Sequence, residues 1–312
     1  MVFSKSTLYA RRACNHAGFS PFISFAQCQS RSWRPEMAYL ARHESYQNGD
    51  RRKVFTMSKI IVAQLQFPIS YSDIRLNIDT ALGLAEKALA SRHVDFLVLP
   101  EMWSTGFISK NQIIANIEST SYILGKFSQL AQYYKSYIIS GSLPRLREHN
   151  LFNTSFVIND SGTIIGQYSK INLFPLMDEL KIFTPGENVY TFETQHCRIG
   201  LAICFDLRFP EMFRLMQREG AQLIFLPAQF PVPRLNHWLT LTKARAIENQ
   251  LFFVATNCVG QCGGYDFFGQ SVVIDPWGEI ISNSEERTGF TLTAIDLKEV
   301  RIVREKIPCV IS

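Results

Sequence analysis

The stretch IGLAICFDLRFPEMFRLMQR, residues 199–218, joins an apolar run directly to a helical pattern. Its first seven residues are all apolar, which is typical of a short strand buried on both faces. Residues Pro210–Arg218 then follow a helical pattern, and Pro210 stands where the strand-like segment has given way to a turn. A buried strand followed at once by a helix predicts an α/β fold.

The same alternation continues outward through the chain from Lys59. Runs rich in β-branched and aromatic residues predict further strands at 60–67, 96–100, 137–144, 154–160, 223–228, 252–259, 271–275 and 290–297. Helical spacing predicts helices at Asn77–Ser91, Ser121–Tyr134 and Asn236–Gln250. The segments NDSG (159–162) and DPWGE (275–279) are typical of tight turns in hairpins. These patterns predict one α/β domain spanning residues 57–312, without internal repeats.

Composition excludes several classes of protein. Of the 312 residues, 46% are hydrophobic, which is enough for a buried core and argues against global disorder. No apolar run is long enough for a transmembrane helix, so we expect no membrane partner. Seven cysteines form no dense disulfide framework, which favours a reducing, cytoplasmic location. Cys258 and Cys262 have the spacing of half a metal site, but no second pair accompanies them, so we expect no metal.

The first 56 residues differ from the rest of the chain. They hold nine Lys or Arg and three acidic residues, a net charge of +6, which leaves about −1 for the remainder of a chain at +5. The body is therefore not basic, and we expect no nucleic-acid partner. The composition of residues 1–56 resembles a mitochondrial transit peptide. Two alternatives are a disordered extension and a true start at Met57.

Glu101 follows the apolar run FLVLP directly. A carboxylate at the carboxyl end of a buried strand lies where α/β sheets build their sites. Apolar neighbours such as Leu99 and Met102 should raise its pKa toward that of a useful general base. The alternative is a glutamate stabilised by a helix N-terminus.

Cys204 and Lys170 are the other candidate reactive residues. Cys204 ends the apolar run of residues 199–205 just before a turn and a helix, a position where a helix N-terminus and a nearby cation lower the pKa of a thiol. The alternative is a buried, inert cysteine. Lys170, in YSKINLFP, has apolar neighbours, and a buried ammonium needs an anionic partner. A solvated loop lysine is the alternative.

Taken together, these segments carry a family resemblance. The blocks LPE, YSKINLF, MDELKIFTPGE, ICFDLRFPE, HW and ARAIENQ occur in the order found in the nitrilase superfamily of carbon–nitrogen hydrolases, from Lys59 to about Lys306. LPEMWSTGF, MDE and CFDLRFPE are most similar to its omega-amidase-like branch. The resemblance implies a four-layer αββα sandwich and a homodimer or larger homo-oligomer. It also implies a catalytic Glu–Lys–Cys triad at Glu101, Lys170 and Cys204, with a second glutamate at Glu179.

Amide hydrolysis fits these residue types. Cys204 would attack the carboxamide carbon, and Glu101 would shuttle protons and activate water. Lys170 and the backbone N–H of Phe205 would hold the oxyanion, with Glu179 orienting Lys170 or the substrate nitrogen. No metal or organic cofactor is expected, and the partners are a small amide and water.

Fewer residues of the sequence indicate how the substrate is recognised than indicate the catalytic chemistry. Arg208, four residues after Cys204, has the geometry to bind a substrate carboxylate, the alternative being a salt bridge with Asp206 or Glu211. We expect pocket walls from three aromatic residues (Trp103, Phe107 and Phe230), although aromatic residues are as often plain core. His237 is expected to support the pocket. On the following helix, Arg245, Glu248 and Asn249 are expected to make structural or interface contacts.

The resemblance predicts an omega-amidase-like enzyme that acts on a short carboxamide bearing a carboxylate, such as a 2-oxo-dicarboxylate monoamide. An alternative is another carbon–nitrogen hydrolase, acting on a carbamoyl amine, a carbamoyl amino acid or an aliphatic amide. A different class of protein, a catalytically silent scaffold on the same fold, is disfavoured by the intact triad.

Overall fold

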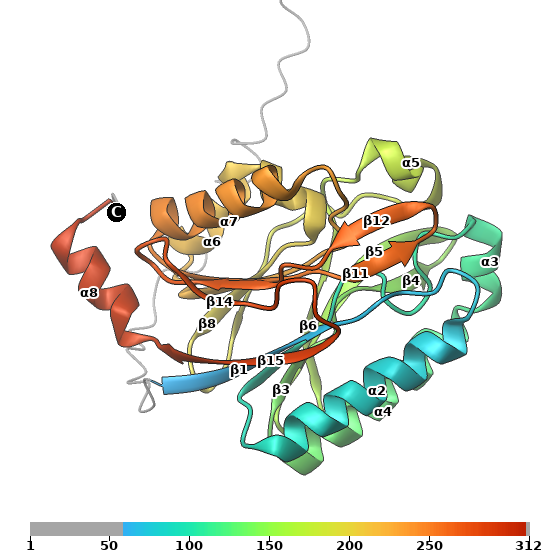
Figure 1. The fold of residues 1–312 in the computed structure, drawn as a ribbon, viewed down its shortest axis with the longest axis horizontal. Coiled ribbons are helices and arrows are strands. Elements are labelled where there is room, and N and C mark those ends of the chain that lie inside the picture. The colour runs from blue at the N-terminus through green and yellow to red at the C-terminus, as the bar shows by residue number, and fades with distance from the viewer. Residues whose placement is uncertain (1–58, 310–312) are drawn as a thin grey trace, which may run out of the picture. The chain divides into compact units, whose positions relative to one another are not determined.

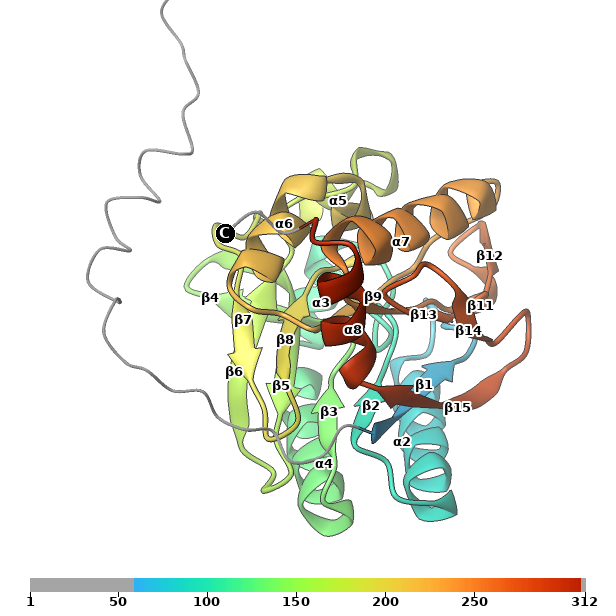
Figure 2. The same ribbon diagram turned by 90° about the vertical axis from the view of Figure 1, so that its left-hand side faces the viewer.

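The computed structural model describes residues 59–309, which contain two β-sheets stacked face to face between helices (Figures 1 and 2). The first sheet has the order β15 (Gly289–Asp296), β1 (Lys59–Gln66), β2 (Phe96–Val98), β3 (Tyr137–Ile139), β5 (Asn150–Ile158) and β4 (Leu143–Arg147), with β6 (Ile164–Ser169) paired to β5. The second has the order β14 (Ile280–Asn283), β13 (Val272–Ile274), β10 (Phe252–Thr256), β9 (Leu223–Pro227), β8 (Arg198–Leu201) and β7 (Thr191–Glu193). A separate ribbon pairs β11 (Val259–Cys262) with β12 (Tyr265–Phe268).

The alternation of side chains along β1 shows how the layers form. Ile60 and Val62 belong to the core between the two sheets, whereas Ala63 and Leu65 belong to the core under the helices of the first sheet. This follows from the twofold periodicity of a strand. Helices α2 (Ile74–Ser91) and α4 (Glu118–Tyr134) cover the first sheet. Helices α6 (Pro210–Arg218) and α7 (Leu235–Asn249) cover the second, so the predicted αββα sandwich is confirmed.

Most predicted elements occur in the structure, but two apolar runs were wrongly read as single strands. The run 137–144 divides into β3 and β4 at Gly141, whose φ is +69°. A Cβ at Gly141 would lie 2.0 Å from the carbonyl oxygen of Pro100, so only glycine fits there. The run 252–259 likewise divides between β10 and β11. Both expected hairpin turns are confirmed, with Gly162 and Gly278 at positive φ.

Several short elements were missed, and all of them except the helix Lys298–Lys306, whose apolar residues follow a helical period, lack clear periodicity. These are β7, β12, β14, α3 (Lys110–Ala115), α5 (Glu179–Ile182), α8 (Lys298–Lys306) and the 3₁₀ turns η1 (Pro175–Met177) and η2 (Cys204–Arg208).

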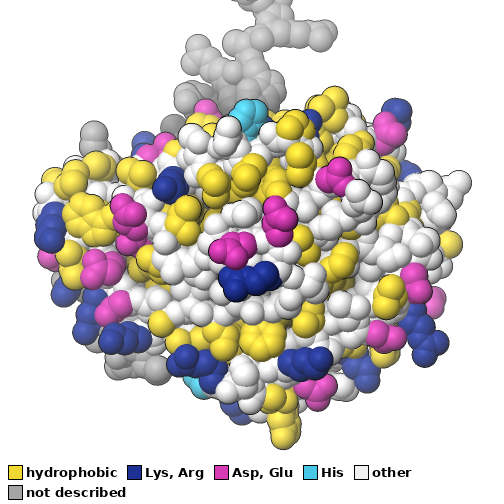
Figure 3. All heavy atoms as spheres, in the orientation of Figure 1, with side chains coloured by type: hydrophobic (Ala, Val, Ile, Leu, Met, Phe, Trp, Pro, Cys, Tyr) yellow, Lys and Arg dark blue, Asp and Glu magenta, His cyan; other side chains and the backbone are white. Residues whose placement is uncertain are grey.

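The distribution of surface charge and the hydropathy of the helices agree with the composition of the chain after residue 56. Figure 3 shows basic and acidic side chains interspersed on the face seen there, without a large area of one sign. Between residues 59 and 309, no helix is both long and apolar enough to cross a membrane. The N-terminal extension predicted for residues 1–56 lies outside the described residues.

Candidate active site

Three reactive side chains follow strands of both sheets. Glu101 lies just after β2, Lys170 directly follows β6, and Cys204 begins η2 after β8 ends at Leu201. Strand β2 is parallel to β1 and β3, and β8 is parallel to β9, and the carboxyl ends of parallel strands are the usual place for sites in α/β sheets. Residues that are far apart in the sequence therefore meet between the two sheets.

Lys170 lies in a buried cluster with two carboxylates. Its Nζ atom is 2.7 Å from Oε1 of Glu101 and 2.7 Å from Oε2 of Glu179. Lys170 is 1% exposed and both glutamates are fully buried. The side-chain amide of Asn153 donates a hydrogen bond to each carboxylate, at 2.9 and 3.0 Å. The expectations of a buried, paired Lys170 and of a Glu179 that orients it agree with this geometry, whereas a solvated lysine does not.

Gln229 joins Glu101 to the nucleophile candidate, and neither Gln229 nor Asn153 was singled out from the sequence. The backbone N–H of Gln229 donates to Oε2 of Glu101 at 2.9 Å, and its side chain donates to the Glu101 carbonyl oxygen at 2.8 Å. The Cys204 thiol donates to the Gln229 carbonyl oxygen at 3.6 Å. Gln229 follows the buried strand β9 just as Glu101 follows β2. A polar residue directly after an apolar run could therefore have identified Gln229 from the sequence.

Burial controls the ionisation of this cluster. It raises the pKa of Glu101, an effect that Lys170 opposes and Glu179 reinforces. Burial alone would lower the pKa of Lys170, but the two carboxylates raise it above its ordinary value, so the ammonium stays charged. The direction of this shift agrees with the expectation that burial raises the pKa of Glu101.

The sequence predicted a lowered pKa for the Cys204 thiol, and this prediction was wrong. Its pKa is raised well above the ordinary value, first by burial and next by the charge of Glu101, and the Lys170 cation only partly opposes this. The thiol is therefore protonated at rest and needs a base. The backbone of Cys204 has φ +48°, an uncommon conformation for a residue other than glycine. Asp206 holds this turn by accepting a hydrogen bond from the Ile203 N–H at 2.9 Å.

A hollow lies directly against the thiol. It is lined by Phe174, Cys204, Phe205, Arg208, Gln229, Phe230, Pro231 and Arg234. Its volume is about 10 Å³, room for about one water molecule, so side chains at its mouth must move to admit a larger molecule. Phe205 and Phe230 thus lie where the sequence predicted. Phe174 and Arg234 were not anticipated, because nothing in their local sequence distinguishes them from ordinary loop residues.

Arg208 projects into this hollow without the expected alternative partners. Asp206 accepts hydrogen bonds from the Tyr168 hydroxyl at 2.7 Å and from the Asn172 side chain at 2.9 Å, so its carboxylate is already satisfied. Between residues 59 and 309, Arg208 makes no salt bridge with any acidic side chain. It donates instead to Nδ1 of His237 at 3.1 Å, so His237 supports the pocket through Arg208.

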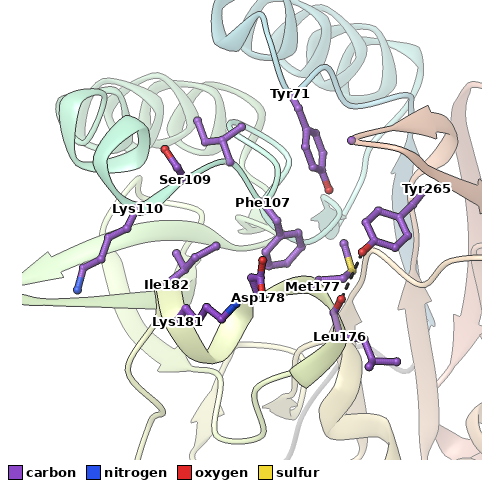
Figure 4. A pocket seen from close by; sticks show the side chains of 12 residues that line it. Tyr71, Phe107, Ser109, Lys110, Leu176, Met177, Asp178, Lys181, Ile182 and Tyr265 are labelled. Atoms are coloured by element: carbon purple, nitrogen blue, oxygen red, sulfur yellow. Dashed lines mark hydrogen bonds and ion pairs between the residues drawn. The ribbon is translucent and has the colours of Figure 1, made fainter.

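Two of the aromatic walls were wrongly predicted. Trp103 is fully buried under the helices of the first sheet, where its indole N–H donates to the carbonyl oxygen of Ser140 at 2.8 Å. Phe107 lines a different hollow of about 470 Å³, with Tyr71 and Tyr265 (Figure 4). Met102, directly after Glu101, has φ 40°, and neither Trp103 nor Phe107 lines the hollow beside Cys204.

The residues predicted to have structural roles make structural contacts. The Arg245 guanidinium donates to the carbonyl oxygen of Leu207 at 3.0 Å and pairs with Glu248, and the Asn249 amide donates to the Arg245 carbonyl oxygen.

The thiol of Cys262 accepts a hydrogen bond from the Ile69 N–H. Within the described part of the chain, no three His, Cys, Asp or Glu side chains are placed to hold a metal ion.

Comparison with known proteins gives this geometry a family context. The family model for carbon–nitrogen hydrolases matches residues 61–305. The 2-oxoglutaramate amidase of Bacillus subtilis (strain 168) is 38% identical over 255 residues, covering 80% of this chain and 96% of that protein. The omega-amidase NIT2 of Homo sapiens is 31% identical over 266 residues, covering 81% and 94%. The structure of Nit3 from Saccharomyces cerevisiae, a member of branch 10 of the nitrilase superfamily, has 28% identity, TM-score 0.75 and coverage of 81% and 96%.

Proposed function

The chain belongs to the carbon–nitrogen hydrolase family, in its omega-amidase-like branch, and on that premise we propose that it releases ammonia from a short carboxamide that also carries a carboxylate. The observation that supports this most directly is the buried Glu101–Lys170–Glu179 cluster, which contacts Gln229 beside the Cys204 thiol. The names of the two amidases above suggest a 2-oxo-dicarboxylate monoamide as the substrate.

In the first half of the proposed reaction, Glu101 takes the proton of the Cys204 thiol as the sulfur attacks the amide carbon. Burial and the charge of Glu101 raise the pKa of the Cys204 thiol, so the thiolate is not stable in advance and proton transfer to the Glu101 carboxylate is expected to accompany the attack. When the tetrahedral intermediate collapses, the C–N bond breaks and Glu101 gives its proton to the departing nitrogen. Ammonia leaves, and the acyl group remains on Cys204 as a thioester.

In the second half, Glu101 takes a proton from a water molecule whose oxygen attacks the thioester. The C–S bond breaks, the carboxylic acid leaves, and the proton returns to Cys204. The net reaction consumes one amide and one water and yields one carboxylate and one ammonium.

The oxyanion of each tetrahedral intermediate needs hydrogen-bond donors to stabilise its charge. The Lys170 ammonium is charged and oriented by two carboxylates. The N–H of Phe205 belongs to the first turn of η2, where backbone donors have no partner within the helix. Each such donor is worth about 3–4 kcal/mol of transition-state stabilisation. Glu179 positions Lys170 in this scheme and does not contact the substrate.

The substrate carboxylate is assigned to Arg208. Its guanidinium lies 5.7 Å from the ring centre of Phe205 and 5.6 Å from that of Phe230, and all three side chains line the hollow. A planar guanidinium that lacks a protein carboxylate is suited to bidentate binding of a ligand carboxylate.

Ammonia release by the purified protein tests this function. The substrates are 2-oxoglutaramate, 2-oxosuccinamate, glutamine, asparagine and a carbamoyl amine, with Cys204→Ala as the control. Turnover of the oxo-amides that the Ala variant lacks supports the proposal. Turnover of the carbamoyl compound alone would overturn the substrate and keep the reaction class.

Thiol labelling separates the enzyme from a silent scaffold on the same fold. Cys204 should react with iodoacetamide faster than the buried Cys197, and the Glu101→Gln variant should lose that advantage. Equal labelling of the two thiols would contradict an activated nucleophile. We also predict a homo-oligomer, which sedimentation of the purified protein would test. The predicted cytoplasmic location would be tested by localising the full-length protein in cells.

A further inference from the structure

Two guanidinium groups line the hollow beside Cys204, and neither has an acidic partner among residues 59–309. Arg208 contacts aromatic rings and His237. Arg234 approaches from the segment before α7 and lies 5.4 Å from the ring centre of Phe174. Within residues 59–309, neither arginine forms a salt bridge.

This arrangement is electrostatically incomplete. Arginine stays protonated in proteins, so the hollow carries two positive charges. Burial, and then the nearby charge of Arg234, lower the pKa of Arg208, which shows that the two cations repel each other. The carboxylates of Glu101 and Glu179 are already engaged by Lys170. An anionic ligand would remove the repulsion between the guanidiniums.

We propose that Arg234 is a specificity-determining residue that joins Arg208 in binding the carboxylate of the substrate. This inference rests on the proposed amidohydrolase function. Phe174 contacts the half-buried Arg234 through a cation–π interaction, in which the ring face accepts no conventional hydrogen bond. A carboxylate offers Arg234 a stronger, charge-assisted partner.

The two arginines also discriminate between substrates by the chemical group that lies next to the substrate carboxylate. In the described part of the chain, no acidic side chain lines the hollow, so nothing there can neutralise a ligand ammonium group. An amino-acid amide such as glutamine carries an ammonium beside its carboxylate and meets two like charges. The corresponding 2-oxo acid carries a carbonyl oxygen at that position, which accepts hydrogen bonds from a guanidinium. The two arginines therefore favour 2-oxo acid amides over amino-acid amides.

Binding to the full-length Cys204→Ala protein tests this assignment without turnover. Calorimetry would give dissociation constants for 2-oxoglutaramate, glutamine and the uncharged pentanamide, each with Arg234 intact and with Arg234→Gln added. We expect the constant for 2-oxoglutaramate to rise about tenfold, the strength of one partly exposed ion pair with a charge-assisted hydrogen bond. The preference over glutamine should narrow, and the constant for pentanamide should change less than twofold.

Two further variants control the experiment. Arg234→Lys keeps the charge and should retain part of the affinity for 2-oxoglutaramate. Arg301→Gln removes the same charge from the exposed face of α8, where its partner is Glu305, and should leave all three constants unchanged.

The outcomes separate this inference from the proposed function. An equal loss of affinity for all three compounds, no loss for 2-oxoglutaramate, or no binding of it to Cys204→Ala would overturn the role of Arg234. If the wild-type protein hydrolyses 2-oxoglutaramate in those cases, the proposed function stands without it. If Arg234-dependent binding occurs and the wild-type protein releases no ammonia, the anion site stands and the proposed function fails.

Discussion

The Nζ atom of Lys170 lies 2.7 Å from Oε1 of Glu101, although the two residues are 69 positions apart in the sequence. Both side chains are buried, so each charge depends on the other for its stability. The same ammonium also contacts Glu179. The buried cluster proposed to be catalytic is therefore also a structural element of the fold.

Lys170→Met should destabilise the protein. The substitution leaves two carboxylates buried without a cation, and removing one partner of a buried ion pair typically costs about 3–5 kcal/mol. Thermal or urea unfolding measures the change. Lys181→Met is the matched control, because Lys181 is largely exposed and pairs with Asp178 at the surface. Equal midpoints for the two variants would show that the cluster does not contribute to stability.

Glu101→Gln should reduce kcat by about 10²- to 10⁴-fold, the usual contribution of a positioned general base. The amide keeps the shape of the side chain but cannot take the thiol proton. Steady-state ammonia release gives the rate, and Glu86→Gln on the exposed face of α2 is the control. If the Glu101→Gln variant kept more than a tenth of the activity, another group would have to be the base.

The acidic limb of the kcat/KM profile should lie above pH 4.5, the ordinary pKa of a glutamate. Glu101 must be ionised to accept the thiol proton, and burial raises its pKa, so activity is lost at a higher pH than for an exposed carboxylate. The raised pKa of Lys170 keeps the ammonium charged through the alkaline side. A pH series of kcat/KM checks this, and a limb at or below 4.5 would contradict the assignment of Glu101.

Gly141→Ala should destabilise the protein and impair activity together. The new Cβ would lie 2.0 Å from the carbonyl oxygen of Pro100, directly before Glu101, at a φ that costs alanine about 1–3 kcal/mol before the clash is counted. Gly83→Ala is the matched control: it lies within α2, no atom lies within 4 Å of its new Cβ, and it should stabilise by about 0.5–1 kcal/mol. Unfolding midpoints and ammonia release on both variants decide the matter, and equal behaviour would argue against a tight contact at Gly141.

Much of the layered fold could be predicted from local pattern. The buried runs at 60–67 and 223–228 have the length and apolar content of internal strands, and Pro210–Arg218 matches α6 at both ends. Elements such as β7 and α5 escaped because three or four residues give too little periodic signal. Gly141 shows a different limit, since a close contact with Pro100 interrupts a run that looks continuous in one dimension.

The sequence by itself determined the αββα class and singled out Glu101, Lys170, Cys204 and Glu179 as candidate site residues, because ordered blocks of residues carry the family pattern. Only the tertiary structure decided which groups surround them. It brought Gln229 and Arg234 to the thiol and carried Trp103 into the core. The physical reason is that strand periodicity fixes which face a side chain takes, whereas the neighbours it meets depend on how separate strands and loops pack. The pKa of Cys204 illustrates this, since burial and the charge of Glu101 both arise from that packing.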